Sequence, residues 1–233
     1  MPRKPRFYLP GVPAHIIQRG NNRQATFFSD EDYKAFLDWL KTGAQKHGCA
    51  IHAYVLMTNH FHLLVTPEQK ESISKMIQFV GRHYVTYFNR TYQRSGTLWE
   101  GRHKGCIVDT ERYLLTCARY IELNPVRAGI VNTPSEYRWS SYRTNALGEK
   151  NEIVEHHPLY LTLGPTTEKR RYSYRELFSN ALASDQLHFL RATAQTGTPL
   201  GNDRFRKQIE GTLGCKVGQA KRGRPPKKGT DPF

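Results

Sequence analysis

The stretch "YVLMTNHFHLLV", residues 54–65, contains two apolar runs that meet at Thr58 and Asn59. Two short runs of β-branched and aromatic residues joined by a two-residue turn are typical of an antiparallel hairpin. We therefore predict one strand at "IHAYVLM", residues 51–57, and its partner at "HFHLLVT", residues 60–66. This hairpin is the centre from which the rest of the fold can be assigned.

Two histidines stand two positions apart in the second strand. We expect His60 and His62 to share one face of the sheet and Phe61 to lie on the other, because side chains alternate along a strand. Neutral imidazoles placed side by side offer two nitrogen ligands to a divalent cation. The motif alone is equally compatible with a pair of hydrogen-bonded core histidines.

The segments around the hairpin alternate between strand and helix patterns. The expected elements are, in order, a strand at 14–20, a helix from Asp30 that Gly48 ends, the two hairpin strands, a helix from Ser72, a strand at 104–109 and a helix at 110–125. Thr110 can cap the last helix and Pro125 is expected to stop it. This β-α-β-β-α-β-α order predicts a ferredoxin-like α+β fold, with one antiparallel sheet and helices packed on one face.

A second segment follows a polar loop at residues 148–151. Three helices are expected there, around residues 172–182, 185–197 and 202–214. We therefore divide the chain into a domain at 1–148, a small helical domain at 149–215 and a basic tail at 216–233 that its composition predicts to be disordered.

The charge balance points to a polyanionic partner. The chain has 35 Lys and Arg against 20 Asp and Glu, a formal net charge of +15 in 233 residues, and nucleic acid leads the candidates. No stretch approaches the roughly 20 apolar residues of a spanning helix, and the first residues lack the apolar region of a signal peptide. We expect a cytoplasmic, nucleoid-associated protein with no membrane partner. The four cysteines are scattered without a C-x-x-C pair, which argues against a zinc cluster and a disulfide framework.

A tyrosine and an asparagine share one face of the helix at 110–125. Tyr120 and Asn124 are four residues apart, so their side chains lie one turn from each other. The amide oxygen of Asn124 can complete a three-donor metal site with the two imidazoles, and the phenol of Tyr120 would then stand beside the cation. The alternative is an ordinary core tyrosine and a helix-terminal asparagine ahead of Pro125.

Several phrases identify a family. The histidine pair, the tyrosine with an amide four residues on, and the stretches "SGTLWEGRHK", "YIELNPVRAGIV", "WSSYR" and "HPLYLTLG" together closely resemble the REP-associated tyrosine transposases (RAYTs). These are relatives of the single-tyrosine insertion-sequence transposases within the HUH nuclease superfamily. The resemblance runs from about residue 5 to about residue 214.

The resemblance implies a function for each of these residues. It implies that His60 and His62 bind a Mg²⁺ or Mn²⁺ ion with Asn124 as third ligand, where insertion-sequence relatives often have Gln, and that Tyr120 is the nucleophile. The implied activity is transposase chemistry, in which an endonuclease and strand transferase acts on single-stranded DNA with hairpins from repetitive extragenic palindromes (REPs) through a 5′-phosphotyrosine. A monomer is the implied state, with a homodimer as the alternative.

Two other functions compete with this one. A REP hairpin DNA-binding or regulatory protein with weak or no cleavage would keep the same fold. A replication-initiating nickase or relaxase would share the chemistry, but no helicase segment or GxxxxGK phosphate loop is present, so no nucleotide cofactor is expected.

Basic residues interleaved with aromatic ones are the candidates for binding DNA. Such surfaces hold the backbone and stack the bases of single strands. The candidates are Arg19, Asn22, Arg23, Arg82, Tyr87, Arg90, Arg94, Trp99, Arg102, Lys104, Arg222 and Arg224. The last two belong to "KRGRPPKK", residues 221–228, which resembles a minor-groove AT-hook and is equally compatible with non-specific attraction to phosphate.

Overall fold

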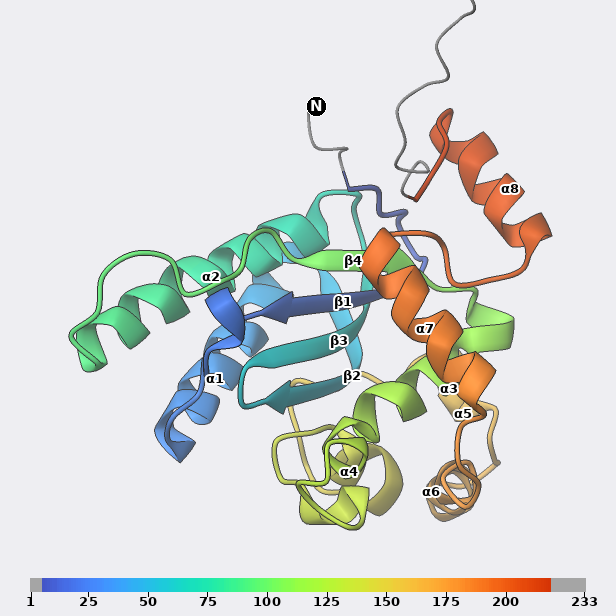
Figure 1. Ribbon diagram of the computed structural model, residues 1–233. Coiled ribbons are helices and arrows are strands. Elements are labelled where there is room, and N and C mark those ends of the chain that lie inside the picture. Colours follow the sequence, from blue (N-terminus) through green and yellow to red (C-terminus); the bar gives the residue numbers. More distant parts are fainter. Residues whose placement is uncertain (1–5, 219–233) are drawn as a thin grey trace, which may run out of the picture.

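A four-stranded antiparallel sheet forms the centre of the fold (Figure 1). The structure is a computed structural model and describes residues 6–218. The strands are β1 (Ala14–Arg19), β2 (Cys49–Met57), β3 (His60–Pro67) and β4 (Lys104–Ile107), in the spatial order β2-β3-β1-β4. The predicted hairpin is thus β2 and β3, and the topology is the ferredoxin-like α+β arrangement expected from the sequence.

Two long helices cover one face of the sheet, as the sequence predicts. They are α1 (Asp30–His47) and α2 (Ser72–Thr91). Phe36 of α1 packs against Phe61 of β3 with ring centroids 4.9 Å apart, and Tyr84 of α2 is fully buried beside them. Gly48 ends α1 in the left-handed conformation, with φ of 60°, which glycine adopts at little cost.

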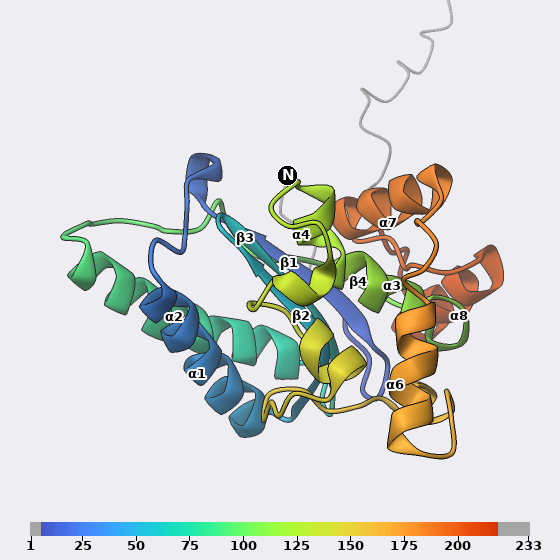
Figure 2. The ribbon, with the colours of Figure 1, turned by 90° about the horizontal axis from the view of Figure 1, so that it is seen from below.

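The opposite face is covered by two helices that the sequence predicts, at 110–125 and 185–197, but does not assign to this face. They are α3 (Thr110–Glu122) and α7 (Ser184–Thr196), and in Figure 2 the sheet lies between α1 and α2 on one side and α3 and α7 on the other. Leu64 of β3 shares a core there with Leu114 and Ile121 of α3 and Ala194 of α7. Side chains from β3 that point away from Phe61 therefore face α3 and α7.

The chain around α3 differs from the prediction at both ends. The N-cap is Asp109, and Thr110 is the first helical residue, so the prediction that Thr110 caps the helix is wrong. Pro125 does not stop the helical path either. After α3 ends at Glu122, Pro125 sits in the first turn of the short helix α4 (Asn124–Arg127), where a missing N–H leaves no bond unmade.

The segment after residue 148 contains four helices within the described residues. Besides α7 they are α5 (Pro158–Leu161), α6 (Thr167–Glu176) and α8 (Asp203–Leu213). Before residue 148, the chain also forms short helical turns at Asn21–Arg23, Pro134–Glu136 and Arg143–Leu147. The helix predicted at 172–182 starts earlier, because the Thr166 side chain caps it by accepting a hydrogen bond from Lys169 N. The division at residue 148 stays a prediction.

A buried carboxylate ties α3 to its surroundings. Glu122 is completely buried and accepts hydrogen bonds from Ser141 Oγ at 2.5 Å, Asn145 Nδ2 at 2.9 Å and the Tyr174 hydroxyl at 2.9 Å. Burial raises the pKa of Glu122 to about 7, against the lowering effect of these three hydrogen bonds. The end of α3, the helix that carries Tyr120, is therefore fixed by the carboxyl group of Glu122, which can titrate near neutral pH.

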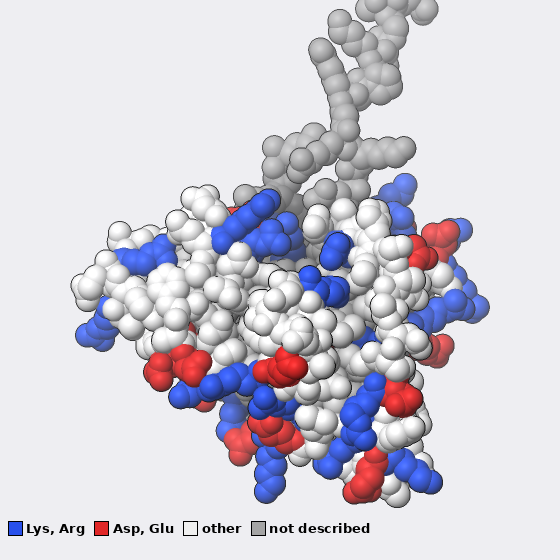
Figure 3. Space-filling model, turned by 60° about the horizontal axis from the view of Figure 1, so that its bottom comes forward, with Lys and Arg blue, Asp and Glu red and all other residues white. Residues whose placement is uncertain are grey.

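The surface charge is unevenly spread. In Figure 3 the Lys and Arg side chains in the upper middle of the face shown have few acidic neighbours, whereas the two signs alternate along its lower edge. Such an accumulation of positive charge suits a polyanion. Within residues 6–218 no helix is both long and apolar enough to cross a membrane. Arg222, Arg224 and the AT-hook-like stretch lie outside the described residues.

Candidate active site

The two histidines of β3 point away from the α1 and α2 layer. Their ring centroids are 5.2 Å apart, and Phe61 between them lies in the opposite core, as the alternation predicts. Burial lowers the pKa of His60 to about 4, and burial with the neighbouring His15 lowers that of His62 well below 6.5. Both rings are therefore neutral near pH 7 and each keeps one lone pair, which a metal ligand needs.

The structure brings Tyr120 and Asn124 to the same place. The ring centroid of Tyr120 lies 5.9 Å from that of His62, at 77° to it. Asn124 Nδ2 donates to the Tyr120 carbonyl at 3.1 Å and to the Ile121 carbonyl at 3.2 Å, which directs its Oδ1 outward from the end of the helix. Residues from a strand and from a helix distant in sequence thus line one cavity.

Arg127 is a further member of this group that the sequence analysis missed. Its Cζ lies 4.1 Å from the centroid of the Tyr120 ring, its Nη1 donates to the Tyr120 carbonyl at 3.0 Å, and its Nη2 donates to Asn124 Oδ1 at 2.7 Å. Arg127 follows Tyr120 by seven residues, a spacing that returns to the same side of a helix. The sequence hides this spacing, because Pro125 predicts the end of the helix before Arg127.

His15 of β1 is the second missed residue. It is fully buried, its Nε2 lies 2.8 Å from His62 Nδ1, and its ring contacts the edge of Tyr120 at 5.7 Å between centroids. The register of β1 against β3 pairs Ile17 with His62, which makes His15 a diagonal neighbour on the same face. The sequence shows only a single histidine in an apolar strand.

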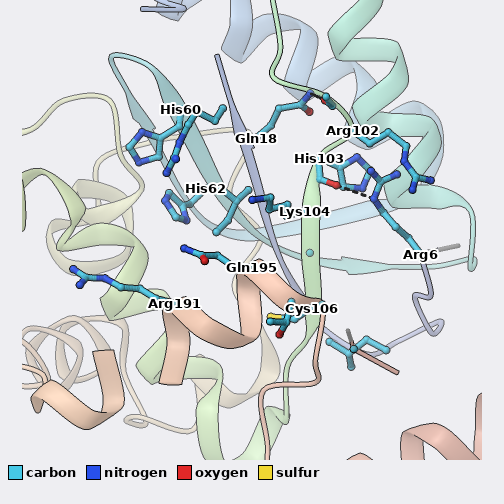
Figure 4. Close-up of a pocket in the computed structure, with 18 of the residues that line it drawn as sticks. Arg6, Gln18, His60, His62, Arg102, His103, Lys104, Cys106, Arg191 and Gln195 are labelled. Atoms are coloured by element: carbon cyan, nitrogen blue, oxygen red, sulfur yellow. Dashed lines mark hydrogen bonds between the residues drawn. The ribbon is translucent and has the colours of Figure 1, made fainter. Parts of the chain in front are cut away.

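The cavity around these residues, shown in Figure 4, has a volume of about 980 Å³ and is partly open to solvent. It extends from His60 and His62 across β1 and β4 toward the residues after α2. The basic side chains that line it are Arg6, Arg19, Arg102, Lys104, Arg127, Arg191 and Lys216. Among the described lining residues Glu100 is the single carboxylate. A phosphate-rich strand would therefore meet a strongly positive surface next to the tyrosine.

The candidate DNA-binding residues fall into three places. Arg19, Arg102 and Lys104 line the cavity. Asn22 and Arg23 are exposed in a turn beyond β1 and have positive φ angles of 52° and 60°, an uncommon conformation for residues other than glycine.

The remaining candidates belong to α2 and the loop after it. Arg82, Tyr87 and Arg90 lie on α2, on the other side of the sheet from the histidine pair. Arg94 follows that helix, and its Nη2 lies 3.5 Å from Gln24 Oε1.

Trp99 requires a correction. The sequence predicts its ring as a stacking surface for bases, but the side chain is only 8% exposed. It packs against Phe61 at 5.7 Å and against Tyr84 at 6.2 Å between ring centroids. The ring of Trp99 therefore belongs to the core beneath α2. Tyr87 is half-buried, and its hydroxyl donates to Asp32 Oδ1 at 3.1 Å, which leaves only part of its ring accessible.

The donors around the cavity fit a divalent cation if the amide of Asn124 supplies the third ligand. His60 and His62 can each offer a neutral nitrogen, and Asn124 Oδ1 has a second lone pair besides the one that accepts from Arg127. In the described part of the chain, no group of three or more His, Cys, Asp or Glu side chains is arranged to hold a metal ion. A three-donor site in this cavity therefore depends on the amide of Asn124.

Comparison with known proteins identifies a family and a fold. The sequence model of the family described as "Transposase IS200 like" matches residues 9–124, which include both histidines, the tyrosine and the asparagine. A solved REP-associated tyrosine transposase bound to a REP hairpin is similar in structure, with a TM-score of 0.53, 18% identity, and coverage of 67% of this chain and 93% of the other. This neighbour supports the fold.

A second solved structure is more distant. It is a putative transposase from Deinococcus radiodurans, with a TM-score of 0.37, 21% identity, and coverage of 55% of this chain and 92% of the other. No curated protein matches the chain.

Proposed function

Because the chain belongs to the family of IS200-like transposases, we propose that it cuts and rejoins single-stranded DNA at REP hairpins with Tyr120 as the nucleophile. Family membership supports a transposase that binds DNA and transfers nucleotidyl groups. The finer assignment, a covalent 5′-phosphotyrosine and a cation held by His60, His62 and Asn124, is our proposal.

One observation carries this proposal. The ring of Tyr120 from α3 lies 5.9 Å from that of His62 on β3, inside a cavity whose charged lining residues are basic except for Glu100. A core tyrosine would need neither neutral imidazoles at its edge nor an open, positively charged cavity in front of it. Both suit a nucleophile that attacks a phosphodiester, because neutral imidazoles can hold a cation and positive side chains attract phosphate.

The chemistry balances without water or a nucleotide. The phenol oxygen of Tyr120 attacks phosphorus, the bond from phosphorus to the 3′ oxygen breaks, and the proton lost by the phenol is matched by one gained at the 3′ hydroxyl. The 5′ phosphate remains on the tyrosine until a different 3′ hydroxyl attacks it in the reverse sense. A divalent cation on the two imidazoles would polarise the scissile phosphate and align its oxygens.

The residues of the chain itself supply binding and orientation. Arg127 holds Tyr120 from the face of its ring and through its carbonyl, so that the hydroxyl is presented from a defined direction. Lys104 and Arg102 on one side and Arg191 of α7 on the other would contact phosphates of the strand. The C-terminal segment thereby takes part in a site whose proposed ligands and nucleophile all precede it in the chain.

The test is formation of a covalent adduct. The full-length protein is incubated with Mn²⁺ or Mg²⁺ and a labelled single strand that carries a REP hairpin and its flanks, then denatured and separated by size. We expect a shifted, protease-sensitive band with the wild type and none with Tyr120→Phe.

Tyr113→Phe is the matched control, because Tyr113 is a half-buried tyrosine on the same helix. An adduct that persists in Tyr120→Phe would refute the nucleophile assignment. Binding without any adduct in the wild type, with either metal, would favour the alternative of a REP hairpin-binding or regulatory protein. The structure gives that alternative one specific support, since Tyr120 is only 4% exposed and Arg127 already occupies Asn124 Oδ1.

A further inference from the structure

We propose that Asn59 and His15 are positioning residues that set the tautomers of the two histidines, so that both present Nε2 to a cation. Each of the two residues engages the Nδ1 atom of one histidine. The proposal rests on the proposed function, because it concerns the cation site of that function. It adds two residues from outside the histidine, tyrosine and amide motif.

The Asn59 contact defines the proton on His60. Asn59 Nδ2 donates to the Arg23 carbonyl at 2.8 Å, which identifies the other amide atom as the oxygen. That oxygen lies 2.7 Å from His60 Nδ1. An amide oxygen can only accept, so His60 Nδ1 must carry the proton. The lone pair of the neutral ring is then on Nε2.

The turn that carries Asn59 is held in place on both sides. The Asn59 carbonyl accepts from Gly20 N at 2.8 Å, and the Thr58 carbonyl accepts from Thr26 N at 2.8 Å. The amide of Asn59 is therefore fixed at both its backbone and its side chain before it meets His60. A rigid acceptor of this kind sets the orientation of the ring as well as its tautomer.

The His15 contact gives His62 the same arrangement when His62 is the donor. Only one proton can lie between His15 Nε2 and His62 Nδ1, which are 2.8 Å apart. If His15 donated it, the proton of the neutral His62 ring would sit on Nε2 and block that atom as a ligand. If His62 donates it, the lone pair of His62 lies on Nε2, where it is available to a cation. His62 with His15 then has the same arrangement as His60 with Asn59.

The burial of His15 supports a positioning role. The side chain is completely buried, and its Nδ1 has no hydrogen-bond partner among the described residues. A buried polar atom without a partner destabilises a fold, so an apolar residue would be better for packing alone. The ring is nearly parallel to that of His62, with centroids 5.1 Å apart and planes at 19°, and it meets Tyr120 edge-on. One imidazole thus orients the proposed ligand and the proposed nucleophile together.

The first test needs no variant. Two-bond ¹H–¹⁵N correlation spectra of the metal-free, full-length protein report which ring nitrogen of each histidine carries the proton. We expect His60 and His62 both to be protonated at Nδ1. Protonation of either one at Nε2 would overturn the assignment for that histidine.

The second test measures Mn²⁺ affinity by calorimetry, with thermal unfolding recorded alongside. His15→Phe keeps an aromatic ring but removes the acceptor, and we expect it to weaken Mn²⁺ binding by about 10- to 100-fold. His15→Gln, whose amide oxygen can accept from His62, should recover most of the affinity. For His60, we expect Asn59→Leu, which removes the acceptor, to weaken Mn²⁺ binding in the same way. Asn59→Asp, which keeps an acceptor oxygen, should recover most of the affinity.

The outcomes are separable from those of the adduct assay. Wild-type affinity in folded His15→Phe and Asn59→Leu would overturn the proposal even if Tyr120 still forms its adduct. Loss of affinity in His15→Phe without recovery in His15→Gln, at unchanged melting temperature, would also overturn it. If the wild type formed no adduct while binding Mn²⁺ as expected, the function would fail and this assignment would stand.

Discussion

The guanidinium of Arg127 lies over the ring of Tyr120, with Cζ 4.1 Å from the ring centroid. The same side chain donates to the Tyr120 carbonyl and to Asn124 Oδ1, so one residue joins the proposed nucleophile to the proposed third ligand. A planar, forked cation can make all three contacts at once, whereas an ammonium cannot.

We therefore expect Arg127→Lys to slow adduct formation by about 10-fold or more, since charge-assisted hydrogen bonds contribute roughly 1.5–3 kcal/mol each. The measurement is the single-turnover rate at saturating DNA. Arg119→Lys is the control, because Arg119 also contacts a ring and a carbonyl but lies away from the cavity. Equal rates for the two variants would mean that Arg127 serves stability alone.

Charge reversal should locate the path of the strand. Lys104→Glu, inside the cavity, is expected to weaken single-strand binding and to reduce the slope of log affinity against log salt by about 1. Arg82→Glu, on α2 across the sheet, should change either quantity little. Affinity is measured by fluorescence anisotropy at several salt concentrations, and a larger effect of Arg82→Glu would move the path onto α2.

The C-terminal segment should contribute to the same binding surface. Arg191 is exposed on α7 and lines the cavity near Arg127, and no hydrogen bond or ion pair of its side chain is found within residues 6–218. We expect Arg191→Glu to lower single-strand affinity several-fold without lowering the melting temperature. Arg206→Glu on α8 is the control, since Arg206 lies outside the cavity and faces Glu210 at 3.4 Å. A null result for Arg191→Glu would confine the site to the residues before α7.

Glu122 should make stability depend on pH in a characteristic direction. Its pKa in the fold is raised to about 7 from 4.5, so the folded state binds more protons than the unfolded state between these values. The stabilisation by the neutral form is complete below pH 4.5 and is lost as pH rises through 7. A shift of this size corresponds to about 3 kcal/mol.

The test compares wild type with Glu122→Gln, which stays neutral at every pH. The difference in melting temperature should move in favour of the variant as pH rises from 4.5 to 7.5. The buried histidines His15, His52, His60 and His103 have lowered pKa values and act in the opposite sense, with stability lost as pH falls below 6.5, but they are common to both proteins and cancel in the difference. A difference independent of pH would show that Glu122 is ionised in the fold throughout.

Local sequence patterns are sufficient to predict the strands of the sheet and which side chains of β3 lie on each face. The turn at Thr58 and Asn59 and the alternation around Phe61 depend only on neighbouring residues, so the sequence predicts them directly. The limits of α1 follow in the same way from its acidic first turn and Gly48.

Long-range contacts explain what was missed. His15 joins the site through the register that pairs Ile17 with His62, and no local signal states that register. Arg127 joins because the chain resumes a helix after Pro125. Trp99 is buried because its indole packs against Phe61 of β3 and Tyr84 of α2, two elements that lie before it in the chain. Each of these depends on how separate elements meet.

The order of the layers along the chain has a consequence for biosynthesis. β1 and β3, with their imidazoles, leave the ribosome first, α3 with its tyrosine follows, and α7 comes last among the elements that line the cavity. The two imidazoles are therefore synthesised before Tyr120, whereas Asn124 of α4 and Arg191 of α7 follow it. The complete site, with its third proposed ligand and its C-terminal arginine, can form only after α7 has been synthesised.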